Sequence, residues 1–335
     1  MTACEVDFSR CDALSSLVAA HGGFPPDVED PIAIALPKSQ LATVNLVTVA
    51  INHQTTPLVG PPLVGEIDGK ECRGWDYLWR RWVRVAEERR DLLTPESLSA
   101  MRPDALVALL ADGKGGGVIS DVERRAAHIA DLGTVMLAHK WDGPADMFCE
   151  AGALIGATDR EGIRGLLREF VAYASDPLEK KTRYMLALQK NTVGWRFADP
   201  QHLGTPVNYH ESRIHLRLGT VRLLDPLLLG RLIRREPVTQ DEDLQIRGAV
   251  TVAINYISSK LGILPSTAHY AFWNFARNVC PRDKTHCDKL PDPCGLPKRY
   301  RLPTVQGCLF APICDSRGKD PAQLPVEHSF DTDWY

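Results

Sequence analysis

The feature that most constrains the fold is a helical spacing of apolar residues that runs through most of the chain. In "GWDYLWRRWVRVAEER" (74–89), apolar residues recur at intervals of three and four, as they do on the buried stripe of an amphipathic helix: Trp75, Leu78, Trp79, Trp82 and Val83. The pattern recurs in 121–141, 158–174, 177–191, 241–262 and 266–280, and 45–56 begins like a buried helix. We therefore predict an all-α protein.

Local signals agree with this prediction. Thr94 and Pro103 stand at the positions of a helix cap and of a first helical turn. In the first half only two stretches look irregular, the glycine-rich 113–117 and 57–69, of which the second has room for a small hairpin. From Pro281 onward the chain is rich in proline, glycine and cysteine and too poor in periodic apolar residues to form its own core.

Composition narrows the functional classes. The sequence holds no run of about 18 apolar residues, so we predict no membrane span. Its first residues lack the basic region and cleavage site of a signal peptide, which indicates a cytoplasmic protein. A net charge of −3 neither favours nor excludes nucleic-acid binding, because a basic face can hide within the sum.

Five of the nine cysteines fall within 35 residues. In a chain without a secretion signal, an odd and clustered count favours metal binding over disulfides. The spacings of five and six residues are wider than zinc knuckles and suit a [4Fe–4S] cluster, with zinc as the alternative. The preferred ligands are the two outer pairs, Cys280, Cys287, Cys308 and Cys314, with Cys294 as an extra or substitute ligand.

These pieces resemble the helix–hairpin–helix base-excision DNA glycosylases of the endonuclease III type. The likeness rests on "LVTVAINHQTT" (46–56), on "LEKKTRYMLALQ" (178–189) with its Lys-Thr step, on "VNYHESRIHLR" (207–217) and on the cysteine loop; 105–133 matches more loosely. The resemblance implies two packed helical lobes with a substrate cleft between them, and cleavage of the N-glycosidic bond of a base flipped out of duplex DNA.

A second likeness points to the same bond. The stretches "GWDYLW" (74–79), "DLQIRGAV" (243–250) and "HYAFWNFAR" (269–277) resemble the queuosine-5′-phosphate N-glycosidase (queuosine salvage) family, whose members act on a free nucleotide. Both families break a base–sugar bond, so the alternative to a DNA glycosylase is an N-glycosidase of a free modified nucleotide. A catalytically inactive DNA-binding relative is the other competitor.

Breaking this bond builds positive charge on the sugar. A carboxylate stabilises that charge, and a lysine in a desolvated pocket can attack as a nucleophile, with strand-cleaving lyase activity as a consequence. The resemblance places the lysine at Lys181 and the carboxylate at position 208, where this chain has Asn208. An amide carries no charge, so its presence there is predicted to cost several orders of magnitude in rate.

Three explanations of Asn208 stay open. It can be an Asp-to-Asn substitution introduced to trap a substrate complex. It can be a natural variant that relies on another acid, with Asp199, Glu211 and Glu179 as the candidates. It can also mark a protein that binds without catalysing.

The resemblance also suggests substrate contacts. Gln54 stands where the family has a residue that fills the gap left by a flipped base, although it can equally cap a helix. His53 and His210 are candidates for a base edge, Trp195 for stacking on the base, and Arg213 for a DNA contact. The family's glycine-rich hairpin is missing, since 175–180 reads "SDPLEK", which suggests an atypical substrate such as a hypermodified phage base.

The resulting hypothesis is a monomeric DNA glycosylase of damaged or modified bases in double-stranded DNA. Four segments are predicted. They are an N-terminal extension with the first helices (1–40), a helical lobe with the gap-filling turn (41–170), a helical lobe with Lys181 and position 208 (171–279), and an iron–sulfur loop with the tail (280–335).

Overall fold

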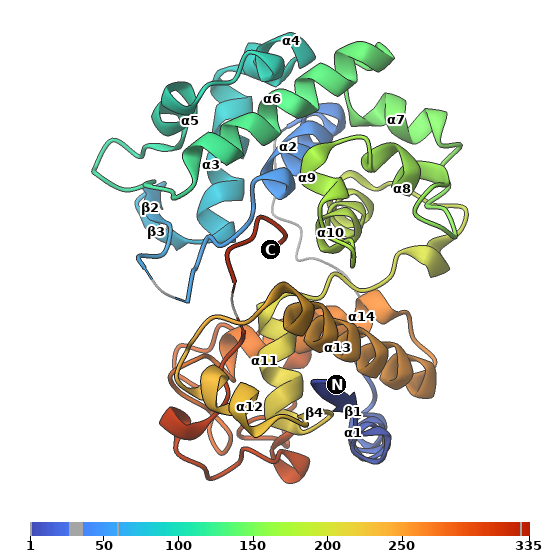
Figure 1. The fold of residues 1–335 in the computed structure, drawn as a ribbon, viewed down its shortest axis with the longest axis vertical. Coiled ribbons are helices and arrows are strands. Elements are labelled where there is room, and N and C mark those ends of the chain that lie inside the picture. The colour runs from blue at the N-terminus through green and yellow to red at the C-terminus, as the bar shows by residue number, and fades with distance from the viewer. Residues whose placement is uncertain (1, 27–35, 59, 329) are drawn as a thin grey trace. The chain divides into compact units, whose positions relative to one another are not determined.

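The computed structural model describes residues 2–26, 36–58, 60–328 and 330–335. It is mostly helical, with 53% helix and 4% strand, so the all-α prediction is confirmed. The chain forms two compact units (Figure 1). Unit 1 comprises Met1–Asp27 and Gly204–Asp331, and unit 2 comprises Val28–Leu203 and Thr332–Tyr335. Each unit therefore combines parts of more than one of the four segments predicted from the sequence.

Unit 2 is built around α2 (Lys38–Ala50), whose residues are buried from Leu41 to Ala50. A helix whose sides are all buried belongs in the middle of a core. It packs against α3 (Trp75–Glu88), α6 (Val122–His139), α7 (Pro144–Glu150) and α10 (Lys180–Leu188). The other helices of the unit are α4 (Pro95–Ser99), α5 (Pro103–Leu110), α8 (Gly162–Leu167) and α9 (Val171–Ala174) (Figure 1). A π-helical turn, Gln189–Val193, extends α10.

A buried amide on α2 is fully hydrogen-bonded inside unit 2. The Asn45 amide donates to Gln189 Oε1 at 3.1 Å and to Thr192 Oγ1 at 2.9 Å, and its oxygen accepts from Trp79 Nε1 at 3.0 Å. These bonds tie α2 to α3 and to the turn after α10. Since an unpaired buried amide costs about 1–3 kcal/mol, the network stabilises one arrangement of these helices over others.

Two sequence predictions in unit 2 are refined. The helix predicted to begin near Asn45 starts at Lys38, because Leu41 and Val44 are buried as well. On α3 the buried stripe includes Tyr77, Val85 and Ala86, while Trp75 and Val83 are only half-buried. The small hairpin exists as β2 (Val64–Ile67) and β3 (Lys70–Arg73), paired antiparallel with Val64 opposite Arg73.

Unit 1 joins the N-terminal residues of the chain to residues 204–331 in one core. The strand β1 (Cys4–Val6) pairs antiparallel with β4 (Val221–Leu223), with Cys4 opposite Leu223. The helices of the unit are α1 (Phe8–Ala20), α11 (Tyr209–Leu218), α12 (Pro226–Ile233), α13 (Gln240–Leu261) and α14 (Pro265–Asn278).

The cysteine-bearing segment adds to the same core. Leu296, Tyr300, Leu309 and Phe310 pack with Phe272 and Phe275 of α14. Beyond α14 the described residues form only the single turns Lys298–Tyr300, Ala311–Ile313 and Pro321–Gln323. The segment is therefore held by the apolar core of unit 1 and by side-chain contacts, in agreement with its lack of helical periodicity.

Among the described residues, no helix combines the length and apolar character that a membrane span needs.

Candidate functional site

In unit 2, Lys181 lies on α10, and its side chain reaches the C-terminal end of α2. Its side chain is 1% exposed, and Nζ donates a hydrogen bond of 2.7 Å to the carbonyl oxygen of Ala50, the last residue of α2. Arg125 on α6 donates to the next carbonyls, those of Ile51 and His53. The C-terminal end of a helix presents unpaired carbonyl oxygens and partial negative charge, which explains why two hydrogen-bond donors of basic side chains lie there.

Burial changes the protonation of this lysine. Desolvation lowers the pKa of Lys181 to about 7, and the neighbouring charges of Lys180 and Arg125 act in the same direction. Among the charges, the carboxylate of Asp333 opposes this most strongly, followed by Asp176. Within the described residues no carboxylate makes a direct ion pair with Nζ. Near neutral pH, Lys181 is therefore a substantially neutral amine, the form that can act as a nucleophile.

Two buried histidines flank this site. His128 Nε2 lies 2.8 Å from Asp333 Oδ2, and His53 Nε2 lies 3.2 Å from Asp121 Oδ2. The two imidazole rings meet edge to face with centroids 6.0 Å apart. Burial and the nearby Arg125 and Lys181 hold the pKa of His53 far below its usual value, so His53 is neutral. We refer to Lys181, Arg125, His53, His128 and Asp333 together as the lysine cluster.

Asp333 reaches the lysine cluster from the last residues of the chain. Thr332, Trp334 and Tyr335 are buried, and the carbonyl oxygen of Tyr335 accepts a hydrogen bond of 3.0 Å from the Gln54 amide. Gln54 adopts a positive φ of 44° just beyond α2. In this structure its backbone anchors the tail, and its role as a gap-filling residue stays a prediction.

The aromatic residue predicted to stack on a base has a partner within unit 2. Trp195 is 8% exposed and stacks on Phe148, with ring centroids 4.4 Å apart and an interplanar angle of 24°. Phe197 packs edge-on against Phe148 at 5.7 Å. Stacking on a flipped base would require Trp195 to leave Phe148 or to use its other face.

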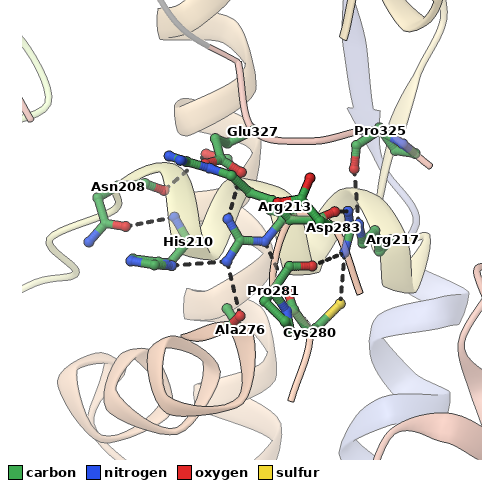
Figure 2. A network of polar contacts seen from close by, with 12 residues as sticks. Asn208, His210, Arg213, Arg217, Ala276, Cys280, Pro281, Asp283, Pro325 and Glu327 are labelled. Atoms are coloured by element: carbon green, nitrogen blue, oxygen red, sulfur yellow. Dashed lines mark hydrogen bonds and ion pairs between the residues drawn. The ribbon is translucent and has the colours of Figure 1, made fainter. Parts of the chain in front are cut away.

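In unit 1, Asn208 is the N-cap residue of α11 (Figure 2). Its Oδ1 accepts a hydrogen bond of 2.7 Å from the His210 amide, and its own N–H donates to Glu211 Oε2 at 3.0 Å. This is a capping box, in which Asn and Asp are about equally favourable at the first position. The amide therefore meets the structural demand at position 208, and the loss of charge leaves the start of α11 intact.

The side chain of Arg213 is used entirely inside unit 1. Its guanidinium pairs with Glu327 at 2.6 Å, and both side chains are 2% exposed. It also donates to the carbonyl oxygens of Cys280 and Ala276 and lies 3.0 Å from His210 Nδ1, as Figure 2 shows. These contacts make Arg213 a residue that positions α11, α14 and His210. A direct contact with DNA would require it to give up one of them.

The three acids proposed to replace a carboxylate at position 208 all have structural partners. Asp199 accepts from the amides of Ile155 and Gly156 at 2.7 and 2.9 Å. Glu211 is fully buried and caps α11. Glu179 pairs with Arg164 at 2.6 Å and with Arg183 at 2.9 Å.

The acid that sequence reasoning missed is Asp333. It lies in "DTDWY" (331–335), where neither periodicity nor a motif marks a functional residue. Its proximity to Lys181 arises only because the chain returns to unit 2 for its last residues.

The two outer cysteine pairs lie near one another in unit 1. Besides burial, the charges of Cys280, Cys287 and Cys314 raise the pKa of the Cys308 thiol, and the amide of Cys308 donates to the carbonyl oxygen of Cys287 at 3.0 Å.

Arg217 on α11 faces the thiols. It is fully buried and donates to Cys280 Sγ at 3.4 Å and to the carbonyl oxygens of Pro281, Arg282 and Pro325 (Figure 2). Within the described part of the chain no carboxylate pairs with it.

This donor set fits a metal centre in its chemistry. Thiolates are the ligands of iron–sulfur clusters and of structural zinc, and a cluster held by four thiolates is anionic, which a buried and unpaired guanidinium would offset. In the described ranges, no three His, Cys, Asp or Glu side chains are already gathered in the geometry of a metal site. The thiols would have to move closer together on binding.

The predicted site residues thus fall into two groups, each inside one unit. Lys181, His53, Gln54 and Trp195 belong to unit 2, and unit 1 holds Asn208, His210, Arg213 and the cysteines. The functional assignment has to be argued from these contacts, because no family model matches the chain and no curated protein matches its sequence.

Proposed function

We propose that the protein hydrolyses an N-glycosidic bond, with Lys181 as its nucleophile. The observation that carries the proposal is a primary amine that is 1% exposed, hydrogen-bonded to the Ala50 carbonyl oxygen and lowered in pKa to about 7. A buried lysine at a merely structural position is normally paired with a carboxylate, since an unpaired buried charge is costly. An amine kept near its titration point is instead suited to attack an electrophilic carbon.

Duplex DNA with a damaged or modified base is the substrate that we propose first. The resemblance to endonuclease III-type glycosylases supports it, and so do exposed basic residues on the cysteine loop, among them Lys284, Lys289 and Lys298. Such side chains can bind phosphates without regard to sequence. A hypermodified phage base, removed in a defence role by a cytoplasmic monomer, is the form of this activity that the altered hairpin favours.

A cluster in the cysteine loop would have a structural role in this activity. We propose that Cys280, Cys287, Cys308 and Cys314 hold a [4Fe–4S] cluster, with zinc as the alternative metal. When bound, the cluster would supply the bonds that order a segment without regular structure and present its lysines. Arg217 would balance part of its negative charge from the buried side.

The test is base release from DNA, followed by mass spectrometry. DNA that carries various modified bases is incubated with the anaerobically prepared protein, and cyanoborohydride is added in parallel to trap an imine between Nζ and the sugar. We expect a released base and a covalent adduct, both abolished by Lys181→Gln. The control is Lys140→Gln, which changes an exposed lysine of the same unit and should retain both signals.

Position 208 is tested in the same assay. If the missing carboxylate limits the rate, Asn208→Asp will release base faster than the protein with Asn208, because the aspartate adds charge while it keeps the helix cap. No base release and no adduct from either form, on any DNA tested, would contradict the proposed activity.

A second candidate is hydrolysis of a free modified nucleotide. The burial of Lys181 and of the residues around Asp333 favours it, because a nucleotide within a duplex needs a wider opening to Nζ than a free nucleotide does. The stretch 175–180 also lacks the glycines of the family's hairpin, whose backbone N–H groups bind a DNA phosphate. Release of base from a nucleoside monophosphate, without binding to DNA at low salt, would select this candidate over the first.

A further inference from the structure

The lysine cluster contains a carboxylate, Asp333, to which the resemblance to known glycosylases assigns no role. Asp333 is 14% exposed in its side chain and is held by His128 at 2.8 Å, while the backbone of Gln54 fixes the tail two residues further on. These contacts come from α6 and from the turn after α2, the elements that also surround Lys181. Asp333 is thus positioned from two sides.

The other acids near Lys181 are committed elsewhere. Asp176 is 1% exposed and accepts the amides of Leu178 and Lys180 at 3.0 and 2.9 Å, where it supports the start of α10. Asp121 pairs with His53 and with Arg124. Asp333, by contrast, is held by His128, and within the described residues no arginine pairs with its carboxylate.

We propose that Asp333 is the catalytic carboxylate of the Lys181 site and accepts the proton that Nζ loses during attack. This inference rests on the proposed glycosidase activity. It also accounts for Asn208, because the chemistry then needs no carboxylate at position 208. His128 keeps Asp333 oriented, as a histidine and a carboxylate do in other acid–base pairs.

The step balances with water as the only other reactant. The lone pair of Nζ forms a bond to C1′ while the bond from C1′ to the base breaks, and the base leaves with that electron pair and takes a proton from water. The ammonium on Nζ passes its proton to Asp333 through a bridging water or substrate atom. Opening of the sugar ring returns the proton to O4′ and leaves an imine on Nζ, which water hydrolyses.

The test compares Asp333→Asn with Asp331→Asn, which makes the same change at an exposed position of the same tail. Base release is measured as above, and the protonation of Lys181 is followed by the ¹³Cε chemical shift of labelled lysine between pH 5 and 10. The absence of the signal in Lys181→Gln assigns it. The second readout is independent of activity, so it separates an electrostatic role of Asp333 from a loss of folding.

We expect Asp333→Asn to lower base release by about 10²-fold or more, the usual contribution of a general base. The midpoint of the Lys181 titration should move below that of the unchanged protein. The remaining charged neighbours, Lys180 and Arg125, disfavour the charged amine, and Asp176 opposes them only in part. Asp331→Asn should change neither quantity.

Three results would overturn the inference. A midpoint that rises toward 10.5 would show that Asp333 merely holds the tail over Lys181 and keeps water out. An unchanged midpoint would show that the two groups do not interact. Unchanged base release in Asp333→Asn, with an active parent protein, would refute the catalytic role alone, whereas no release from any form would refute the proposed glycosidase and this role with it.

Discussion

The surroundings of Lys181 lower the stability of the folded protein and at the same time suit the residue to catalysis. Its Nζ bonds to a helix-end carbonyl, and its pKa is lowered to about 7. Burial of an amine opposes folding whenever the amine is charged, so the residue is kept at the expense of stability. A site that keeps a buried amine despite this loss of stability is a candidate for function.

The stability of the protein should report this lowered pKa. Between about pH 7 and 10.5, Lys181 is neutral when folded and protonated when unfolded, so the unfolded state binds more protons. The free energy of unfolding, relative to that of Lys181→Met, therefore rises with pH over this window, and the advantage of methionine is largest below pH 7. Urea unfolding of both proteins at pH 6.5 and 9.5 measures the trend.

The exposed Lys319 provides the control for this prediction. Lys319→Met should show no comparable dependence on pH. An equal difference between Lys181→Met and the parent protein at both pH values would contradict the lowered pKa.

A second residue-scale prediction concerns Arg213 and Glu327. Removing one partner of a buried ion pair leaves an uncompensated charge, which typically costs 3–5 kcal/mol. Glu327→Gln should therefore destabilise unit 1 by about that amount, since Arg213 is 2% exposed. The double variant Arg213→Met/Glu327→Gln should lose less than the sum of the single changes in urea unfolding. Additive losses would show that the two side chains act independently.

At the scale of elements, α11 explains how much of the site can be predicted from sequence. The capping pattern at Asn208 and Glu211 is local, so the start of the helix follows from the chain itself. The partners of the same helix are not local. Arg213 meets Glu327, 114 residues further along, and Arg217 meets Pro325, 108 residues further along. No periodicity encodes such pairings.

The cap gives an element-scale prediction. Asn208→Ala should destabilise unit 1 by about 1 kcal/mol, because the His210 amide loses its acceptor. Asn208→Asp should keep or slightly raise stability, since a negative charge at a helix N-terminus is worth roughly 0.3–1 kcal/mol. Thermal unfolding of the three proteins decides this. A loss in Asn208→Asp equal to that in Asn208→Ala would mean that position 208 is not acting as a cap.

The composition of the lysine cluster, unlike the start of α11, could not be predicted from the sequence. The helical stretch that carries Lys181 can be read from the sequence, and so can the helix that ends before His53. Asp333 could not be found, because its position depends on a tail that returns to unit 2 after 128 residues of unit 1, Gly204–Asp331. Fold class is therefore largely local information here, and the composition of the site is not.

At the scale of the whole molecule, the cysteine loop is predicted to couple metal content to the stability of unit 1. Serine at any one of Cys280, Cys287, Cys308 or Cys314 should lower the iron and acid-labile sulfide bound per chain. It should also lower the melting temperature, because a loop that has lost its metal holds Phe310 less firmly in the core of unit 1. Elemental analysis of anaerobically purified protein measures the metal. Zinc in place of iron would identify the alternative centre.

Two other cysteines sharpen this experiment. Cys149→Ser alters an exposed thiol in unit 2 and should leave the metal content unchanged. Cys294→Ser separates the two ligand sets, since retained iron supports the outer pairs and lost iron makes Cys294 a ligand. Metal content that survives all four primary substitutions would rule out a centre in this loop.

The order of segments along the chain has a consequence for biosynthesis. Residues 28–203 of unit 2 leave the ribosome before Gly204–Asp331, the larger part of unit 1, so the helices around α2 can pack early. The first residues of unit 1 must wait for their partners, since β1 pairs with β4 more than 200 residues later. Asp333 arrives after both. A nascent or prematurely terminated chain would therefore display Lys181 without its carboxylate, and the chemistry proposed for the site would begin only once translation had passed residue 333.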